Sequence, residues 1–169
     1  MKKYSLMVIA NLLPALLIFM PQCSTAQKNA DSVQQNTFES LVVSQHYRFI
    51  AQSATTASGR LRMLDAQYDL QVSKEQIVAD LPYFGTAYFS PVNPSQTGVK
   101  FTSKDFDYNM VKRKKDGWDI LIKSKDISDA QNLNLTVYSN GKATLLVTSN
   151  SRQGISFNGY IVAPNKEVK

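Results

Sequence analysis

Few side chains in this 169-residue sequence could carry out catalysis, and most of them lack the partners that catalysis needs. His46 is the single histidine, and Cys23 is the single cysteine. One histidine cannot form a two-histidine metal site, and a Ser-His-Asp triad would depend on it entirely. The sequence also contains no phosphate-binding loop. We therefore expect no catalytic residue, no metal site and no cofactor.

Two pairs of carboxylates keep hydrolysis open as an alternative. Asp126 and Asp129 flank a two-residue segment, and Glu75 and Asp80 lie on either side of a short apolar run. Glycosidases use two such groups, one as a general acid and the other as a base or nucleophile. Nothing in the sequence places these side chains in a cleft, so a carboxylate-dependent hydrolase is only the alternative function.

The segment Asp105–Asn109 has side-chain oxygens at every second position, as at the start of an EF-hand calcium loop. Such a loop needs glycine at its sixth position, where this sequence has Met110. Phe106, Tyr108 and Met110 alternate with polar residues, which is typical of a half-buried strand. We interpret the segment as a strand and not as a calcium site.

The densest charge in the chain is the basic run Lys112–Lys115. We interpret it as the solvated end of a hairpin, where lysines also discourage aggregation between sheet edges. The alternative is a patch for acidic lipid headgroups or anionic glycans.

The stretch richest in aromatic residues is Leu81–Phe89, which also contains one proline and one glycine. Pro82 fixes its own φ angle, and Gly85 permits backbone angles that other residues avoid. We expect a rigid corner whose rings fill a core built by a sheet. Tyr83 and Phe84 should point to opposite sides. We expect Phe84 to be the more buried of the two, with the Tyr83 hydroxyl directed to water or a polar partner.

Five residues are the candidates for a binding surface, namely Tyr83, Phe84, Tyr88, Arg152 and Gln153. A planar guanidinium group beside an aromatic ring could hold a ligand by cation–π contact and hydrogen bonds. The partner would be an apolar ligand, a peptide or a glycan. The alternative is that Arg152 donates hydrogen bonds to backbone carbonyl groups and fastens its own loop.

These residues need a scaffold, and the hydrophobic pattern predicts one that is mostly β. A helical stripe is approximated by Phe38, Leu41, Val42, Gln45 and Phe49. We expect the helix to end near His46, which we assign to a cap or to the surface. From Tyr47 onward, alternating patterns predict one strand after another. We expect an α+β, mostly β fold, with an N-terminal helix packed on an antiparallel meander of about eight or nine strands. The sheet would be strongly curved or a small barrel.

The C-terminal half contains the clearest hairpin signal, Asn140-Gly141. The strand that follows it, Ala143–Val147, is apolar on both faces, and we expect both faces to be buried. Trp118, the single tryptophan, lies among alternating apolar residues and should be on the buried face.

A second hairpin turns near Asp116-Gly117, and its loop length decides which faces meet. A two-residue turn would pair Val111 with Ile122 and place the apolar faces on opposite sides. A three-residue loop that ends with Gly117 pairs Met110 with Ile122 and aligns these faces. We therefore predict the longer loop, with Gly117 in a left-handed conformation.

The first 26 residues predict a secretory signal peptide, with Lys2 and Lys3 before an apolar run and small residues at its end. We place cleavage after Ala26. Residues 27–36 would then be a flexible leader, 37–163 a single β-rich domain and 164–169 a C-terminal tail. The mature chain would carry a net charge of +4, without a basic arm or zinc-finger spacing, which indicates no nucleic-acid partner.

Lipidation of Cys23 is the alternative to soluble export, and a membrane contact is expected only in that case. A lipoprotein signal normally has a small residue just before the cysteine and often leucine three before it. Gln22 and Met20 occupy these positions, so they favour cleavage after Ala26.

Several of these motifs together resemble the bacterial family called domain of unknown function 4251. The resemblance covers roughly Ser40 to Val162. It is carried by Leu81-Pro82-Tyr83-Phe84-Gly85, Ala87-Tyr88, Gly98-Val99-Lys100-Phe101, Asp105-Phe106-Asp107-Tyr108, Asn140-Gly141, Ala143-Thr144-Leu145 and Arg152–Gly159. It implies an exported protein of Bacteroides-like bacteria, in the periplasm or on the outer surface of a Gram-negative cell. It implies no catalytic residue and no ligand, and Lys142 departs from the aromatic residue common after this glycine.

The first hypothesis for function is an exported, non-enzymatic binding or accessory module of the cell envelope. A carboxylate-dependent hydrolase and a structural subunit that docks by a sheet edge are the alternatives. An apolar cavity would favour ligand binding, a polar cleft with two carboxylates would favour hydrolysis, and a filled core would favour docking.

Overall fold

The computed structural model describes residues 37–85, 98–127 and 132–164. The expected signal peptide (1–26), the leader (27–36), Tyr88 and residues 165–169 of the expected tail lie outside these ranges. A helix of residues 37–44 precedes nine strands. The strands are β1 (Tyr47–Thr56), β2 (Leu61–Val72), β3 (Ile77–Leu81), β4 (Val99–Ser103), β5 (Phe106–Lys112), β6 (Trp118–Ser124), β7 (Asn132–Val137), β8 (Lys142–Thr148) and β9 (Ile155–Val162).

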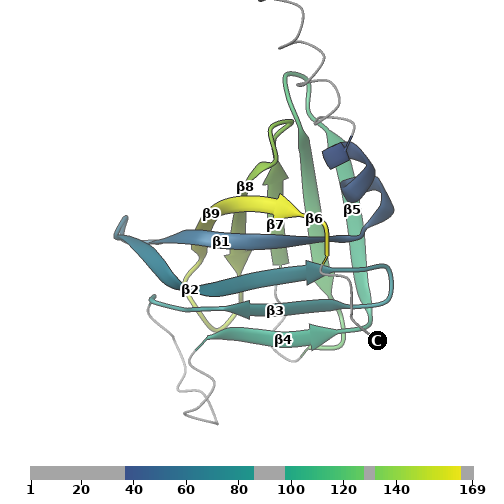
Figure 1. Ribbon diagram of the computed structural model, residues 1–169. Coiled ribbons are helices and arrows are strands. Elements are labelled where there is room, and N and C mark those ends of the chain that lie inside the picture. Colours follow the sequence, from purple (N-terminus) through teal and green to yellow (C-terminus); the bar gives the residue numbers. More distant parts are fainter. Residues whose placement is uncertain (1–36, 86–97, 128–131, 165–169) are drawn as a thin grey trace, which may run out of the picture.

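All nine strands belong to one antiparallel sheet with the order β4-β3-β2-β1-β9-β8-β7-β6-β5. Consecutive strands are neighbours except β4 and β5, which form the two edges, and the first strand pairs with the last. Figure 1 shows that β1–β4 run across the direction of β5–β8, with the curved β9 between the two groups. The fold is therefore mostly β, and the sheet curls until it is nearly closed into a barrel.

The number of strands explains why the sheet does not close. Alternate strands of an antiparallel sheet run in the same direction, so β4 and β5 would have to pair as parallel strands. Only Lys104 and Asp105 connect them, whereas a parallel pair needs a connection of about a dozen residues. Asp126 instead joins the two strands at a corner. It accepts hydrogen bonds from Ser103 Oγ at 2.5 Å and from the backbone N–H groups of Lys104 and Asp105 at 2.7 and 3.2 Å.

The core lies inside the curled sheet, and alternation along β6, β7 and β8 builds a large part of it. In β6, every second residue from Trp118 to Ser124 is buried, and β7 and β8 repeat this pattern. The four largest fully buried side chains are Trp118, Tyr47, Phe49 and Phe157. The prediction that Trp118 is on the buried face is therefore confirmed, at 1% exposure.

The alternation in β8 also corrects a prediction. Ala143, Leu145 and Val147 are buried, but Leu146 on the other face is 41% exposed. The expected burial of both faces is wrong because only the inner face of β8 meets the core.

Strand β1 bends at a bulge, and this bend needs a glycine on the neighbouring strand. Gln52 is the extra residue in β1, since Ala51 pairs with Gly159 and Ser53 pairs with Asn158. A Cβ atom on Gly159 would lie 1.9 Å from the carbonyl oxygen of Ile50. Only glycine lets the two backbones approach this closely, as is common where a strand turns a barrel corner.

The β7–β8 hairpin forms where Asn140-Gly141 predicted it. Tyr138 donates its N–H to Lys142 O, and Gly141 donates its N–H to Tyr138 O, both at 2.9 Å. Gly141 has a φ of 79°, which is the left-handed residue of a three-residue hairpin loop.

The β5–β6 hairpin has the predicted faces but a different register. Met110 pairs with Ile120 and not with Ile122, so the prediction was wrong by two residues. A slip of two residues keeps every side chain on its face, and the apolar faces align as expected. Gly117 has the predicted left-handed conformation (φ 81°), but its backbone lies against Val137 of β7. Gly117 is therefore placed beside β7. Compared with the prediction, the hairpin loop is displaced towards Lys114 and Lys115.

The helix ends in a hydrogen-bonded turn that glycine usually closes. Gln45 donates its N–H to Val42 O at 3.2 Å, and His46 donates its N–H to Leu41 O at 3.1 Å. These are the two bonds of a Schellman motif, and Gln45 occupies its left-handed position with a φ of 53°. Val42 is fully buried, and its carbonyl oxygen accepts a hydrogen bond from the Tyr108 hydroxyl at 3.1 Å.

Candidate binding site at one end of the sheet

Three separate segments meet at Tyr83, which follows the end of β3. Pro82 has no N–H to donate, so the ladder of β3 stops at Leu81 and the chain turns away. The Tyr83 hydroxyl donates a hydrogen bond to Gln153 O at 3.0 Å, in the loop between β8 and β9. The guanidinium carbon of Arg152 lies 5.3 Å from the centroid of the Tyr83 ring. Arg152 Nη1 donates to Gly98 O at 2.9 Å, just before β4.

The structure thus brings Tyr83, Arg152 and Gln153 together. The hydrogen bond from Arg152 to a backbone carbonyl group, which was the alternative to ligand binding, is present, and this side chain fastens its loop to the residue before β4. Gln153 takes part through its backbone oxygen. A ligand-binding role for these three residues stays a prediction, as does that of Tyr88, which lies outside the described residues.

The order of burial in the Tyr83-Phe84 pair is the reverse of the prediction. Phe84 is 37% exposed, whereas Tyr83 is partly buried and packs against the core. A tyrosine ring can be buried when its hydroxyl finds an acceptor, and Gln153 O supplies one. The ring of Phe84 instead has the guanidinium group of Arg62 over it, with the carbon 4.8 Å from the centroid.

The structure adds a neighbouring surface that the sequence analysis missed. Leu61 and Met63, at the start of β2, are 63% and 76% exposed. With Arg62 and Phe84 they form what we call the β2 surface. A shallow hollow of about 460 Å³ lies on it and is lined by Arg62, Met63, Leu64, Asp65, Tyr68 and Phe84. The available signal was that the alternation of apolar residues changes phase within this segment, from Leu61 and Met63 to Leu64.

The β2 surface is exposed because β3 is much shorter than β2. β3 pairs only with Asp69–Val72, the last four residues of β2. On the other side, β1 pairs with Leu61–Met63, and then Gln52 alone stands opposite the four residues Leu64–Gln67. Among the described residues, no strand pairs with the outer edge of β2 before Asp69.

Two of the candidate carboxylates, Asp126 and Asp80, have partners within the described part of the chain. Asp126 binds the β4–β5 corner, and the hydrogen bond from Ser103 and those from backbone N–H groups hold the pKa of its carboxyl group below the usual value. Asp129 lies outside the described residues. Asp80 is paired with Lys100, with 2.9 Å between Oδ1 and Nζ.

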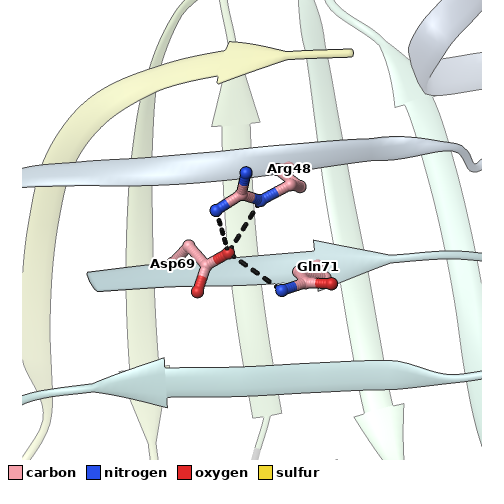
Figure 2. A network of polar contacts seen from close by, with 3 residues as sticks. All are labelled: Arg48, Asp69 and Gln71. Atoms are coloured by element: carbon pink, nitrogen blue, oxygen red, sulfur yellow. Dashed lines mark hydrogen bonds and ion pairs between the residues drawn. The ribbon is translucent and has the colours of Figure 1, made fainter. Parts of the chain in front are cut away.

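A buried ion pair lies on the outer face of the sheet where β1 meets β2. Arg48 Nε and Nη2 donate to the same oxygen of Asp69, at 2.8 and 2.7 Å, and Gln71 Nε2 donates to it at 3.1 Å. Figure 2 shows the three side chains converging on this oxygen. The side chains of Arg48 and Asp69 are only 11% and 12% exposed. The network is a structural one, because its charges are paired within the sheet.

The basic run at the β5–β6 hairpin is exposed and partly paired. Lys112 lies 3.3 Å from Glu39 of the helix, and Arg113 lies 3.5 Å from Asp119 and over the Tyr138 ring. These contacts fit a solvated hairpin end. The exposed His46 follows the helix.

The described residues contain neither a metal-binding cluster nor a helix that could span a membrane. No group of three or more His, Cys, Asp or Glu side chains in residues 37–85, 98–127 and 132–164 could hold a metal ion. Within the same ranges, no helix has the length and apolar character that crossing a membrane requires.

Comparisons with known proteins give a family and a fold. The family described as domain of unknown function (DUF4251) matches residues 29–161. A crystal structure of a DUF4251 family protein from Bacteroides eggerthii DSM 20697 is similar, with a TM-score of 0.59 and 13% sequence identity. The similarity covers 81% of this chain and 92% of that one. No curated protein matches. At this identity the solved structure shows the fold alone.

Proposed function

Since this chain belongs to the DUF4251 family, whose description names no activity, we propose a function from its surface. The proposal is an exported, non-enzymatic binding or accessory module of the cell envelope that binds its partner at the β2 surface. The docking hypothesis and the binding hypothesis of the sequence analysis thereby become one, because the surface lies along a sheet edge.

The proposal is carried by the exposure of Met63 and Phe84, which line the same hollow at the edge of β2, and by that of Leu61 two residues before Met63. Single exposed apolar side chains are ordinary, but grouped ones commonly mark an interaction site. Met63 at 76% exposure is the most exposed large hydrophobic side chain of the described part of the chain. The interior of the sheet is occupied by the aromatic side chains of Trp118, Tyr47 and others, which also favours docking on the outside.

The basis for export is the N-terminal sequence. Lys2, Lys3, the apolar run and the small residues before Gln27 have the order of a signal peptide. Intact-mass measurement of the protein from its own envelope should give a chain that begins at Gln27. The added mass of a diacyl or triacyl group on Cys23 would instead indicate a lipid-anchored protein and contradict soluble export.

Site-specific photo-crosslinking in the producing cells tests the binding surface. A photoreactive phenylalanine analogue at Met63 should form a covalent adduct with one partner. The same analogue at Val43, an exposed apolar position of the helix (56%), is the matched control and should not. Equal adduct formation at both positions, or none at Met63, would contradict the proposal.

A further inference from the structure

We infer that the β2 edge, Leu61–Met63, binds an extended peptide with alternating apolar and acidic residues, which pairs with β2 as an additional strand. The inference rests on the proposed function, because it names the partner and the binding mode of the β2 surface. It is argued from the hydrogen bonds, the faces and the charges of this edge.

The backbone of the edge offers unused hydrogen-bonding groups among the described residues. Thr56 donates its N–H to Arg60 O at 3.1 Å, so Thr56 and Arg60 form a hydrogen-bonded pair of the β1–β2 ladder. Such pairs alternate with pairs whose N–H and C=O groups point away from each other. The pairs Thr55–Leu61 and Ser53–Met63 are therefore of the second kind. Leu61 and Met63 direct both groups outward, to the side that β3 does not reach.

The two faces of this edge differ in chemistry. Arg62 pairs with Ala54, which pairs with the fully buried Phe157, so Arg62 lies on the inner face. Leu61 and Met63 lie on the outer face. A strand added to this edge would place alternate side chains next to Leu61 and Met63, and the intervening ones next to Arg62. Apolar side chains suit the first position and carboxylates suit the second.

The charge of the edge favours an acidic partner. Arg60 and Arg62 are exposed, and within the described residues neither forms an ion pair with a carboxylate. Arg62 stacks on Phe84, which holds its guanidinium group beside the edge. A carboxylate of an added strand would reach a positioned cation that has planar donors.

The same charge disfavours a second copy of this chain as the occupant. An antiparallel pairing of two β2 edges that uses both outward residues would pair Leu61 of one copy with Met63 of the other. That register places Arg62 directly opposite Arg62 of the second copy. Like charges in directly opposed positions destabilise a strand pair.

Binding of three labelled synthetic octapeptides to the full mature protein tests the inference. The first alternates valine and glutamate, the second has the same composition in two blocks, and the third alternates valine and lysine. Fluorescence anisotropy should show binding of the first and at least about tenfold weaker binding of the other two. Raising the salt concentration should weaken the first interaction, because it includes an ion pair with an exposed arginine.

Protein variants separate the backbone and charge contributions. Met63→Pro removes an outward N–H that β1 does not use, and proline is tolerated on edge strands. It should weaken binding of the alternating acidic peptide by about tenfold, which corresponds to one lost hydrogen bond. Arg62→Gln should weaken it and reduce its salt dependence. Leu146→Ala, at an exposed leucine on β8, is the matched control and should leave binding unchanged. Unchanged melting temperatures would show that the variants are folded.

Three results would overturn the inference. They are equal binding of the alternating and block peptides, full binding by Met63→Pro, and slow hydrogen exchange at the Leu61 and Met63 amides in the free protein. The last would mean that the edge is already paired. Cross-links at position 63 in cells without peptide binding would reject strand addition and leave the proposed function standing. Absence of both the cross-links and the peptide binding would reject the proposed function and the strand addition together.

Discussion

The Tyr83 ring lies against the core because its hydroxyl group donates a hydrogen bond to Gln153 O. Phe84 has no polar group that could join such a network, and its ring turns outward beneath Arg62. The usual order of burial, phenylalanine before tyrosine, is reversed by one carbonyl oxygen. That oxygen belongs to a loop 70 residues later in the chain, so the residue pattern around Tyr83 does not contain it.

Tyr83→Phe should lower the free energy of unfolding by about 1 kcal/mol. The variant keeps the ring but removes one hydrogen bond and leaves the Gln153 carbonyl group without this donor. Urea denaturation measures the change. Tyr160→Phe, at an exposed tyrosine of β9 (37%), is the control and should have little effect. An equal loss in both variants would show that the hydroxyl of Tyr83 is not a fastener.

The Arg48–Asp69 pair should be strongly coupled. Removal of one partner leaves a buried charge, so Arg48→Met or Asp69→Leu alone should each cost about 3–5 kcal/mol. The double variant replaces the pair by apolar side chains of similar size and should lie within about 1 kcal/mol of the native protein. A double-mutant cycle of denaturation free energies measures the coupling. Additive losses would indicate that the two side chains are solvated independently.

At the scale of the elements, Gln45 at the end of the helix has a left-handed backbone conformation, which is unfavourable for a residue other than glycine. Gln45→Gly should raise the free energy of unfolding by about 0.5–1 kcal/mol, since glycine adopts the left-handed conformation without a steric cost. Ser44→Gly, one position earlier inside the helix, should lower it. Denaturation curves of the two variants check this pair of opposite signs. A loss from Gln45→Gly would mean that contacts of the Gln45 side chain outweigh the backbone term.

Element identities could be predicted from the sequence because alternation is a local property. Trp118, Ile120 and Ile122 reveal their strand by spacing alone, and the turn at Gly141 follows from its residue type. The Met110 register could not be predicted, because it depends on the contact between Gly117 and Val137 of another strand. The β2 surface was missed for a related reason. This surface is exposed because β3 is shorter than β2 and, among the described residues, leaves the outer edge of β2 unpaired at its start. The local sequence of either strand does not reveal this difference in length.

At the scale of the whole molecule, two tyrosines inside the curled sheet, Tyr47 and Tyr108, should lower the stability of the protein at high pH. Burial, and to a lesser extent the neighbouring Tyr108, raises the pKa of Tyr47 well above the ordinary value. Burial raises the pKa of Tyr108 to about 12, although its hydrogen bond with Tyr47 acts in the opposite direction. Below about pH 9 both phenols are protonated in the folded and unfolded chains, so they cause no pH dependence there.

The free energy of unfolding should therefore fall as the pH rises from about 9 to about 12. In this range the unfolded chain releases phenolic protons that the folded protein retains. Tyr108→Phe removes one of these protons and should make the decline less steep. Stability measured by denaturant titration at a series of pH values tests this, with the exposed Tyr138→Phe as the control. An identical decline in Tyr108→Phe would show that other groups cause it.

The pairing of β1 with β9 has a consequence for how the chain acquires this structure. These strands lie in the middle of the sheet, yet they are the first and last to be synthesised. Until β9 is present, β1–β4 and β5–β8 are two separate ribbons with no strand pair between them. Contacts between residues so distant in sequence make folding slow. The half-finished chain therefore cannot complete its core, and the two ribbons can join into one sheet only after β9 has been synthesised.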